Sequence, residues 1–192
     1  ELVRGNDPHP DAVFLEDMFI GECVQEGLPL NTVISSKIFR SLAEKGKLPQ
    51  EVSILVVPVS AAEGKTLDLL EEFLDKGGKV LFYGALQRAS EPFRKWIGLK
   101  VGTPLSGDAE IQVCLEEDSV SSAAFTATAH LLPQYACGGL VGELGEAAES
   151  EVRAWASVNG ERRVAALVRK RKNGGEIGFV RAILPAAATV SS

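Results

Sequence analysis

LDLLEEFLDKGGKVLFYGALQRAS, the stretch from Leu67 to Ser90, contains the pattern that decides the fold. Leu67, Leu70 and Phe73 recur at helical spacing and share one face of a helix, with carboxylates on the other. Two glycines, at 77 and 78, then end the helix and permit a tight return. The uninterrupted apolar run that follows is typical of a strand buried on both faces. The stretch therefore predicts one helix–strand unit of an α/β fold.

Strands and helices are expected to alternate on both sides of this stretch. Short apolar or β-branched runs predict strands at 12–15, 30–35 and 51–58, and amphipathic runs predict helices at 17–26, 36–46 and 93–97. Ser36, Thr66 and Ser90 are the expected N-caps. Because strand crossovers are right-handed, this βαβαβαβα order predicts a flavodoxin-like, doubly wound and mainly parallel sheet.

The second half of the chain changes character after Gly98. Extended runs are expected at 110–115, 121–129, 152–158, 164–171 and 176–184. Asn159-Gly160 and the triplet 173–175 are hairpin-type turns, so the α/β domain at 12–184 is expected to contain a C-terminal antiparallel meander from about residue 110. Residues 1–11 read as a proline-broken arm or linker and 185–192 as a tail. Glu1 replaces an initiator Met, which suggests a processed protein or an excised domain.

Composition narrows the possible partners. The 192 residues can form a single core, and the formal net charge of −6 argues against nucleic acid. The basic residues 162–163 and 169–172 are expected to be solvated around a hairpin tip, with a polyanion or acidic-partner site as the alternative. No apolar run approaches the roughly 20 residues of a membrane span. The sequence is therefore compatible with a soluble bacterial-type protein, cytoplasmic or secreted.

Cysteine spacing gives no sign of a metal or redox site. Cys23, Cys114 and Cys137 are far apart and odd in number, unlike a zinc site or a redox dithiol. They are expected to be buried or incidental thiols. No cofactor and no metal are expected.

These motifs resemble those of a known superfamily. The run Ile54–Pro58, the helix that ends at Gly78, and the strand 79–84 are similar to the class I glutamine amidotransferase-like superfamily. More narrowly, they resemble the noncatalytic versions built into large bacterial glycoside hydrolases, such as the trimerisation domain of certain beta-galactosidases. The segment 93–99 and the charged hairpin 163–180 extend the resemblance to about residues 12–184. It implies a structural module.

Catalytic members of that superfamily carry a Cys or Ser on a sharp turn after a strand, activated by a nearby His. Here the turn reads Tyr83-Gly84-Ala85-Leu86-Gln87, so a methyl group stands where the nucleophile is required. The downstream His-x-Glu pair is also missing. We therefore interpret Gly84, Ala85 and Gln87 as a vestigial elbow and expect no catalytic residue there.

Other candidate sites remain open at this stage. Cys137, seven positions after His130, is the alternative nucleophile for a hydrolase or amidotransferase-like enzyme. The carboxylates 71–72 and 116–118 are expected to be solvated surface rather than a catalytic pair. Phe82, Phe93 and Trp96 are expected in the core. Trp155, with polar neighbours at spacing two, is the candidate for stacking on a sugar or a partner.

The favoured function is a noncatalytic module of a larger carbohydrate-processing protein, possessing surfaces for sibling domains or identical subunits. The parent protein would then be a glycoside hydrolase. Carbohydrate is a further candidate partner. Two alternatives stay open: an enzyme that uses Cys137 and His130, and a domain that senses a sugar or an anion at the carboxyl ends of the strands.

Overall fold

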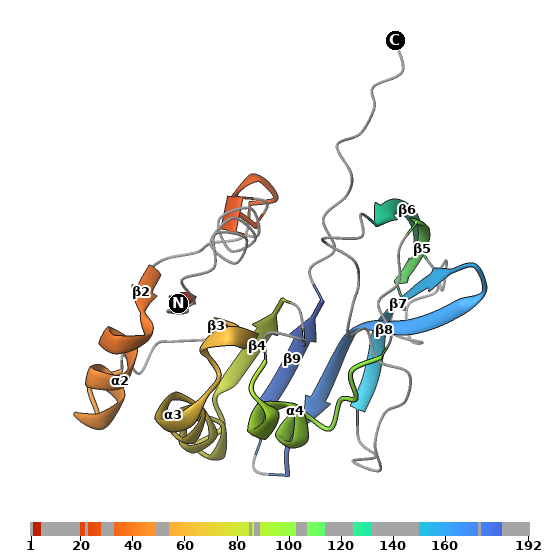
Figure 1. The fold of residues 1–192 in the computed structure, drawn as a ribbon. Helices are drawn as coiled ribbons and strands as arrows, with labels where there is room; N and C mark the ends of the chain where they lie inside the picture. Colours follow the sequence, from red (N-terminus) through yellow and green to blue (C-terminus); the bar gives the residue numbers. More distant parts are fainter. Residues whose placement is uncertain are drawn as a thin grey trace.

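A mixed β-sheet runs through the part of the chain that the structure describes (Figure 1). This computed structural model describes residues 2–4, 20, 21, 23–27, 33–48, 54–84, 86, 89–102, 107–113, 125–131, 150–172 and 174–181. The strands in these ranges are β1 (Leu2–Arg4), β2 (Val33–Ser35), β3 (Leu55–Pro58), β4 (Lys79–Tyr83), β5 (Gly107–Val113), β6 (Phe125–Leu131), β7 (Ser150–Val158), β8 (Glu161–Lys170) and β9 (Glu176–Val180). Their order across the sheet is β2-β1-β3-β4-β9-β8-β7-β5-β6.

The first five strands in that order are parallel. β1 pairs with β2 and β3, β3 pairs with β4, and β4 pairs with β9, whose Phe179 lies opposite Phe82. With β9 taken as the fifth strand, this is the 2-1-3-4-5 order of flavodoxin-like sheets. The predicted α/β class and its mainly parallel first half are confirmed.

The other half of the sheet is antiparallel. β8 pairs with β9 and β7, and β5 pairs with β7 and β6. The β7–β8 turn is the two-residue loop Asn159-Gly160, and both residues have positive φ, 50° and 82°. Such φ values match the twist of a hairpin and favour Asn-Gly. The predicted meander is confirmed, and its last strand, β9, also completes the parallel half.

Three helices and a 3₁₀ turn pack on one face of the parallel strands: α2 (Ser36–Glu44), α3 (Gly64–Asp75), α4 (Glu91–Ile97) and η1 (Val59–Ala61). Phe39, Leu70 and Phe93 are fully buried and belong to one core with Phe82 of β4. On the opposite face Val56 and Tyr83 form a small cluster, against which Ile20 packs from a helical segment. Apolar residues therefore pack on both faces of the parallel half, as expected for a doubly wound sheet.

Several boundaries differ from the sequence-based predictions. Leu2–Arg4 lie within the segment predicted as an arm, yet they form β1 between β2 and β3. The predicted strand at 12–15 lies outside the described residues. α2 is capped by Ser35, whose Oγ accepts from the Ile38 N–H at 3.3 Å, and not by Ser36. α3 begins two residues before Thr66, which is a buried residue inside the helix. Ser90 caps α4 as predicted.

The glycine pair between α3 and β4 has two separate causes. Gly77 has a φ of 85°, a conformation that favours glycine. Gly78 lies against the Phe73 ring, and a Cβ at this position would come within 2.3 Å of it. The pair therefore closes α3 tightly and aims β4 into the core.

Candidate functional site

The turn after β4 is the place where the sequence predicted a vestigial elbow. Gly84 has a φ of 109°, and its N–H donates to the Val180 carbonyl oxygen at 3.1 Å, which ties the turn to the end of β9. Leu86 is fully buried. Ala85 and Gln87 lie outside the described residues. The sharp turn itself is therefore present, at the carboxyl edge of the parallel strands.

The described surroundings of this turn hold little reactive chemistry. A Cβ on Gly84 would lie 3.5 Å from Val59 Cγ2 of η1. Ser90 Oγ donates to the Ala62 carbonyl oxygen at 3.1 Å and accepts from the Phe93 N–H at 3.2 Å, so its hydroxyl serves as a cap and a tether. Among the described residues of 58–62, 83–86 and 89–90, none carries a carboxylate, an imidazole or a thiol. These residues shape a turn and supply no acid–base pair.

Arg181 is a residue at this edge that the sequence analysis did not single out. It follows β9 and is only 5% exposed, and its backbone N–H donates to the Ala165 carbonyl oxygen at 2.8 Å. No sequence pattern marks an arginine after an apolar strand as buried, so Arg181 could not be identified from the sequence. It places one positive charge at the carboxyl end of β9.

His130 lies far from the elbow. It belongs to β6, opposite Asp108 of β5, and β6 is the last strand of the sheet. Five strand spacings separate β6 from β4, which is about 24 Å at ~4.8 Å per strand. Cys137 lies outside the described residues, so its pairing with His130 stays a prediction. His130 cannot serve as a base at the turn after β4.

Trp155, the predicted sugar-stacking residue, is covered on one side. The Arg162 guanidinium lies 4.2 Å from the centre of its ring, and Arg162 Nη2 donates to Gln112 Oε1 at 2.9 Å. Trp155 is half-buried and packs against the main core. A sugar would have to displace Arg162 before it stacks on that face.

Three residues of the basic cluster are not simply solvated, and the first of them is Arg163, which is buried and contacts Glu161. Arg169 donates to the carbonyl oxygens of Trp96 and Ile97 at the carboxyl end of α4, and its Nε donates to Ser150 Oγ at 3.1 Å. Arg171 Nη2 lies 2.9 Å from Asp75 Oδ1 and 3.5 Å from Glu71 Oε1, near the carboxyl end of α3. The prediction of a solvated cluster is therefore wrong for Arg163, and it is wrong for Arg169 and Arg171 because helix ends attract cations. It holds for Lys170 and Lys172, which are exposed.

Burial lowers the pKa of Arg169, and the neighbouring Arg171 charge lowers it further. The guanidinium remains protonated all the same. Arg171 Nη1 is buried and has no hydrogen-bond partner in the described part of the chain. One guanidinium donor at this end of the sheet is therefore left without a hydrogen-bond acceptor among the described residues.

Other predicted site residues have ordinary surroundings. Glu72 is exposed, and Glu71 of the same pair contacts Arg171, while 116–118 lie outside the described residues. Cys23 is half-buried. Within the described ranges there is no group of three or more metal-ligating side chains. No helix in those ranges has the length and apolar character needed to span a bilayer.

Solved structures of other proteins share the fold of this chain. No protein-family model matches the sequence, and no curated protein matches it significantly. Among solved structures, a ThuA-like protein from Bacteroides uniformis superposes with a TM-score of 0.55 at 13% identity, over 93% of this chain and 79% of that one. An exo-beta-1,4-mannosidase from an Opitutaceae bacterium gives 0.55 at 11% identity, over 93% of this chain and 30% of that one. A GMP synthase subunit from Thermoplasma acidophilum gives 0.52 at 14% identity, over 94% and 81%.

These similarities define the class of fold. The chain shares its α/β fold with the ThuA-like protein and the GMP synthase subunit. Against the mannosidase, the chain spans less than a third of the matched protein's length.

Proposed function

We propose that this chain is a noncatalytic module of glutamine amidotransferase-like fold within a larger carbohydrate-processing protein, where it packs against sibling domains or identical subunits. The observation that carries this proposal is the turn after β4. Gly84 adopts the positive φ of a sharp elbow, but the next residue in the sequence is Ala85. An alanine methyl group can neither attack an electrophile nor exchange a proton.

Two further observations support the proposal. The described residues around the elbow include no histidine, and His130 lies on the last strand of the sheet as the structure describes it. A mannosidase also contains a region of this fold within a chain more than three times as long. A rigid sheet domain without reactive groups still presents helices and strand edges as a docking surface.

Cysteine reactivity tests the noncatalytic part. We expect all three cysteines to react with iodoacetamide slowly, with the pH dependence of an ordinary thiol, because none is expected in an activated site. Mass spectrometry of peptides labelled between pH 5 and about 9 measures each rate. Rapid labelling of Cys137 below neutral pH, lost in His130→Ala, would instead establish the alternative enzyme.

The variant Ala85→Cys is a second test of the same elbow. It restores a thiol at the nucleophile position, and we expect no ammonia release from glutamine, since no described residue near the turn carries an imidazole that could activate the thiol. Ala89→Cys is the matched control, because Ala89 is a buried alanine close to the turn. Glutamine hydrolysis by Ala85→Cys alone would show that the catalytic surroundings persist.

Sedimentation velocity of the chain tests the docking part. Self-association in the micromolar range is expected if identical subunits are the partners. A monomer at every concentration would rule out identical subunits and leave the sibling domains, which pull-down with the flanking domains of the parent chain would then have to show.

A further inference from the structure

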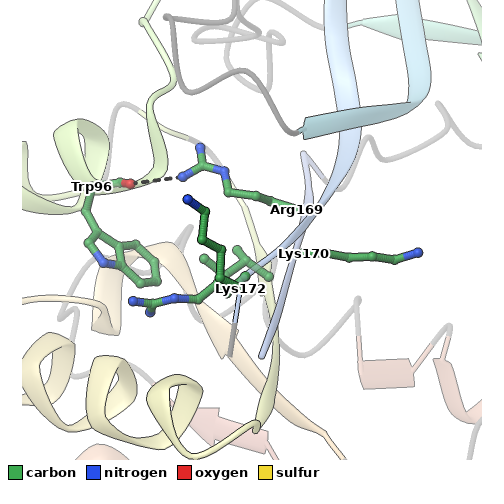
Figure 2. Close-up of a pocket in the computed structure, with 6 residues that line it drawn as sticks. Trp96, Arg169, Lys170 and Lys172 are labelled. Atoms are coloured by element: carbon green, nitrogen blue, oxygen red, sulfur yellow. Dashed lines mark hydrogen bonds between the residues drawn. The ribbon is translucent and has the colours of Figure 1, made fainter. Parts of the chain in front are cut away.

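A groove of about 470 Å³ lies at the edge of the sheet opposite the elbow (Figure 2). It is lined by Trp96, Ile177 and the four consecutive basic residues Arg169, Lys170, Arg171 and Lys172. Lys170 pairs in register with Glu176, the first residue of β9, so this is the amino edge of the parallel strands. The groove is thus separate from the turn at Gly84.

Both helix ends at the groove are already occupied by arginine. Arg169 holds the carboxyl end of α4, and Arg171 holds that of α3 through Asp75. These contacts fix two guanidinium groups in partly buried positions at the groove, close enough for the charge of Arg171 to act unfavourably on Arg169. An anion placed between them would relieve that repulsion and accept hydrogen bonds from both guanidinium groups.

Lys172 supplies a further positive charge at the same place. Figure 2 shows its side chain pointing toward the space between Trp96 and Arg169, whereas Lys170 points away from them. No carboxylate of a described residue forms an ion pair with Lys172. Its ammonium group is therefore available to an anion that enters the groove.

Trp96 supplies an apolar wall. Its indole packs edge-on against Phe82 at 5.7 Å and lies 5.9 Å from Phe93, yet the residue is only half-buried. The remaining indole surface faces the groove that it lines. A volume of this size suits a compound of one or two rings. An indole wall beside several cations fits a ring that carries an anionic group.

We propose that this groove binds a sugar phosphate, with the phosphate among Arg169, Arg171 and Lys172 and the sugar ring against Trp96. The chain as a whole carries a net charge of −6, so the basic groove is a local exception that attracts anions at short range. Because the groove lies at the opposite edge from Gly84, its occupancy is independent of whether the elbow is inert.

Isothermal titration calorimetry with three probes tests this site. Glucose 6-phosphate is expected to bind, inorganic phosphate to bind more weakly, and glucose to give no heat. Lys172→Ala should weaken glucose 6-phosphate about tenfold, the loss expected for a hydrogen bond to a charged group. Lys76→Ala, which removes the same charge from an exposed side chain at the end of α3 that does not line the groove, should change the affinity less than about twofold at 0.15 M salt. Both lysines are exposed, so neither variant threatens the fold.

Trp96→Phe separates the ring from the phosphate. It should weaken glucose 6-phosphate several-fold and leave inorganic phosphate unchanged. Absence of heat with both phosphates would overturn the proposal, as would equal losses in Lys76→Ala and Lys172→Ala, which would indicate nonspecific charge. Equal affinities for inorganic phosphate and glucose 6-phosphate would overturn the sugar part and leave a simple anion site.

Discussion

The two edges of the parallel strands differ in what they hold. At the carboxyl edge, where enzymes of this architecture place their chemistry, the chain has a glycine turn, an alanine and a serine that serves as a cap. At the amino edge it has four consecutive cations, a half-buried tryptophan and a groove. The edge that the fold makes available for catalysis has no nucleophile at its elbow, and the run of four cations is at the opposite edge.

Architecture accounts for part of this difference. α3 and α4 both run from the carboxyl edge to the amino edge, so their negative ends meet where the β8–β9 hairpin turns. A basic hairpin is stabilised there by two helix dipoles, while the same residues at the carboxyl edge would face helix starts. The amino edge is consequently held by electrostatics and the carboxyl edge by backbone geometry.

Arg169→Met tests how far the amino edge depends on that hairpin, and it should give the largest effect. The variant leaves the carbonyl oxygens of Trp96 and Ile97 without their charged donor. The expected loss is about 2 kcal/mol in the free energy of unfolding, measured by urea denaturation. Lys170→Met is the control, because it makes the same charge change at an exposed neighbour and should cost less than about 0.5 kcal/mol. Equal losses would mean that Arg169 acts only through net charge.

Gly84→Ala tests the geometry of the carboxyl edge. At a φ of 109° any side chain is strained, so we expect a loss of about 1 to 2 kcal/mol. Gly160→Ala in the β7–β8 turn is the matched control: its φ is also positive, at 82°, and a Cβ there would meet nothing. If Gly84→Ala cost far less than Gly160→Ala, the elbow would not be held in its observed conformation.

Sequence patterns predicted the parts of this fold that local chemistry determines. The continuous apolar runs gave β3 and β4, the Asn-Gly pair gave the β7–β8 turn, and Ser90 gave the start of α4. β1 escaped prediction because three residues are too few to show a period, and its partners lie far away in sequence. The N-cap of α2 was misplaced by one residue because two adjacent serines carry the same hydroxyl.

The candidate site was less predictable for a physical reason. Gly84 and the missing nucleophile could be identified from a contiguous stretch, since the elbow is local. The groove could not, because Trp96 and Arg169 are 73 residues apart and meet only after β9 joins β4. Charge patterning alone predicted solvated residues, and no sequence signal shows that a helix end will accept an arginine. The contact between Arg162 and Trp155 was missed in the same way.

Arg171→Gln compares the two helix contacts of the amino edge, that of Arg171 with α3 and that of Arg169 with α4. The variant removes the ion pair with Asp75 at 2.9 Å and the longer contact with Glu71. Arg171 is partly exposed, so solvent screens the pair and the loss should stay below about 1 kcal/mol. Lys79→Gln, which breaks the more exposed pair with Glu176, is the reference and should cost still less. A loss larger than that of Arg169→Met would show that α3, not α4, is the helix the hairpin stabilises most.

The smallest expected effect is a difference between the two edges in how their charged groups make stability depend on pH. Glu91, in the first turn of α4 at the carboxyl edge, accepts a hydrogen bond from Lys95 Nζ at 2.8 Å, and this bond, with the lysine charge, lowers the pKa of Glu91. A carboxyl group whose pKa is lower in the folded state stabilises the fold above its unfolded pKa, and that contribution is lost as the pH falls through the folded pKa. Arg169 stays protonated throughout, so it adds no pH dependence in the same range.

Lys95→Gln should therefore raise the pKa of Glu91 toward its ordinary value, as measured by carbon-detected NMR titration of the side chain. The acid branch of the stability curve should become slightly shallower, because the folded and unfolded pKa values of Glu91 converge. Lys65→Gln is the parallel variant at a different place, since Lys65 lowers the pKa of Glu44 in α2 through the same kind of bond. If the pKa of Glu91 did not move in Lys95→Gln, the positive end of the helix dipole would be its cause, and the carboxyl edge would carry more electrostatic influence than its side chains suggest.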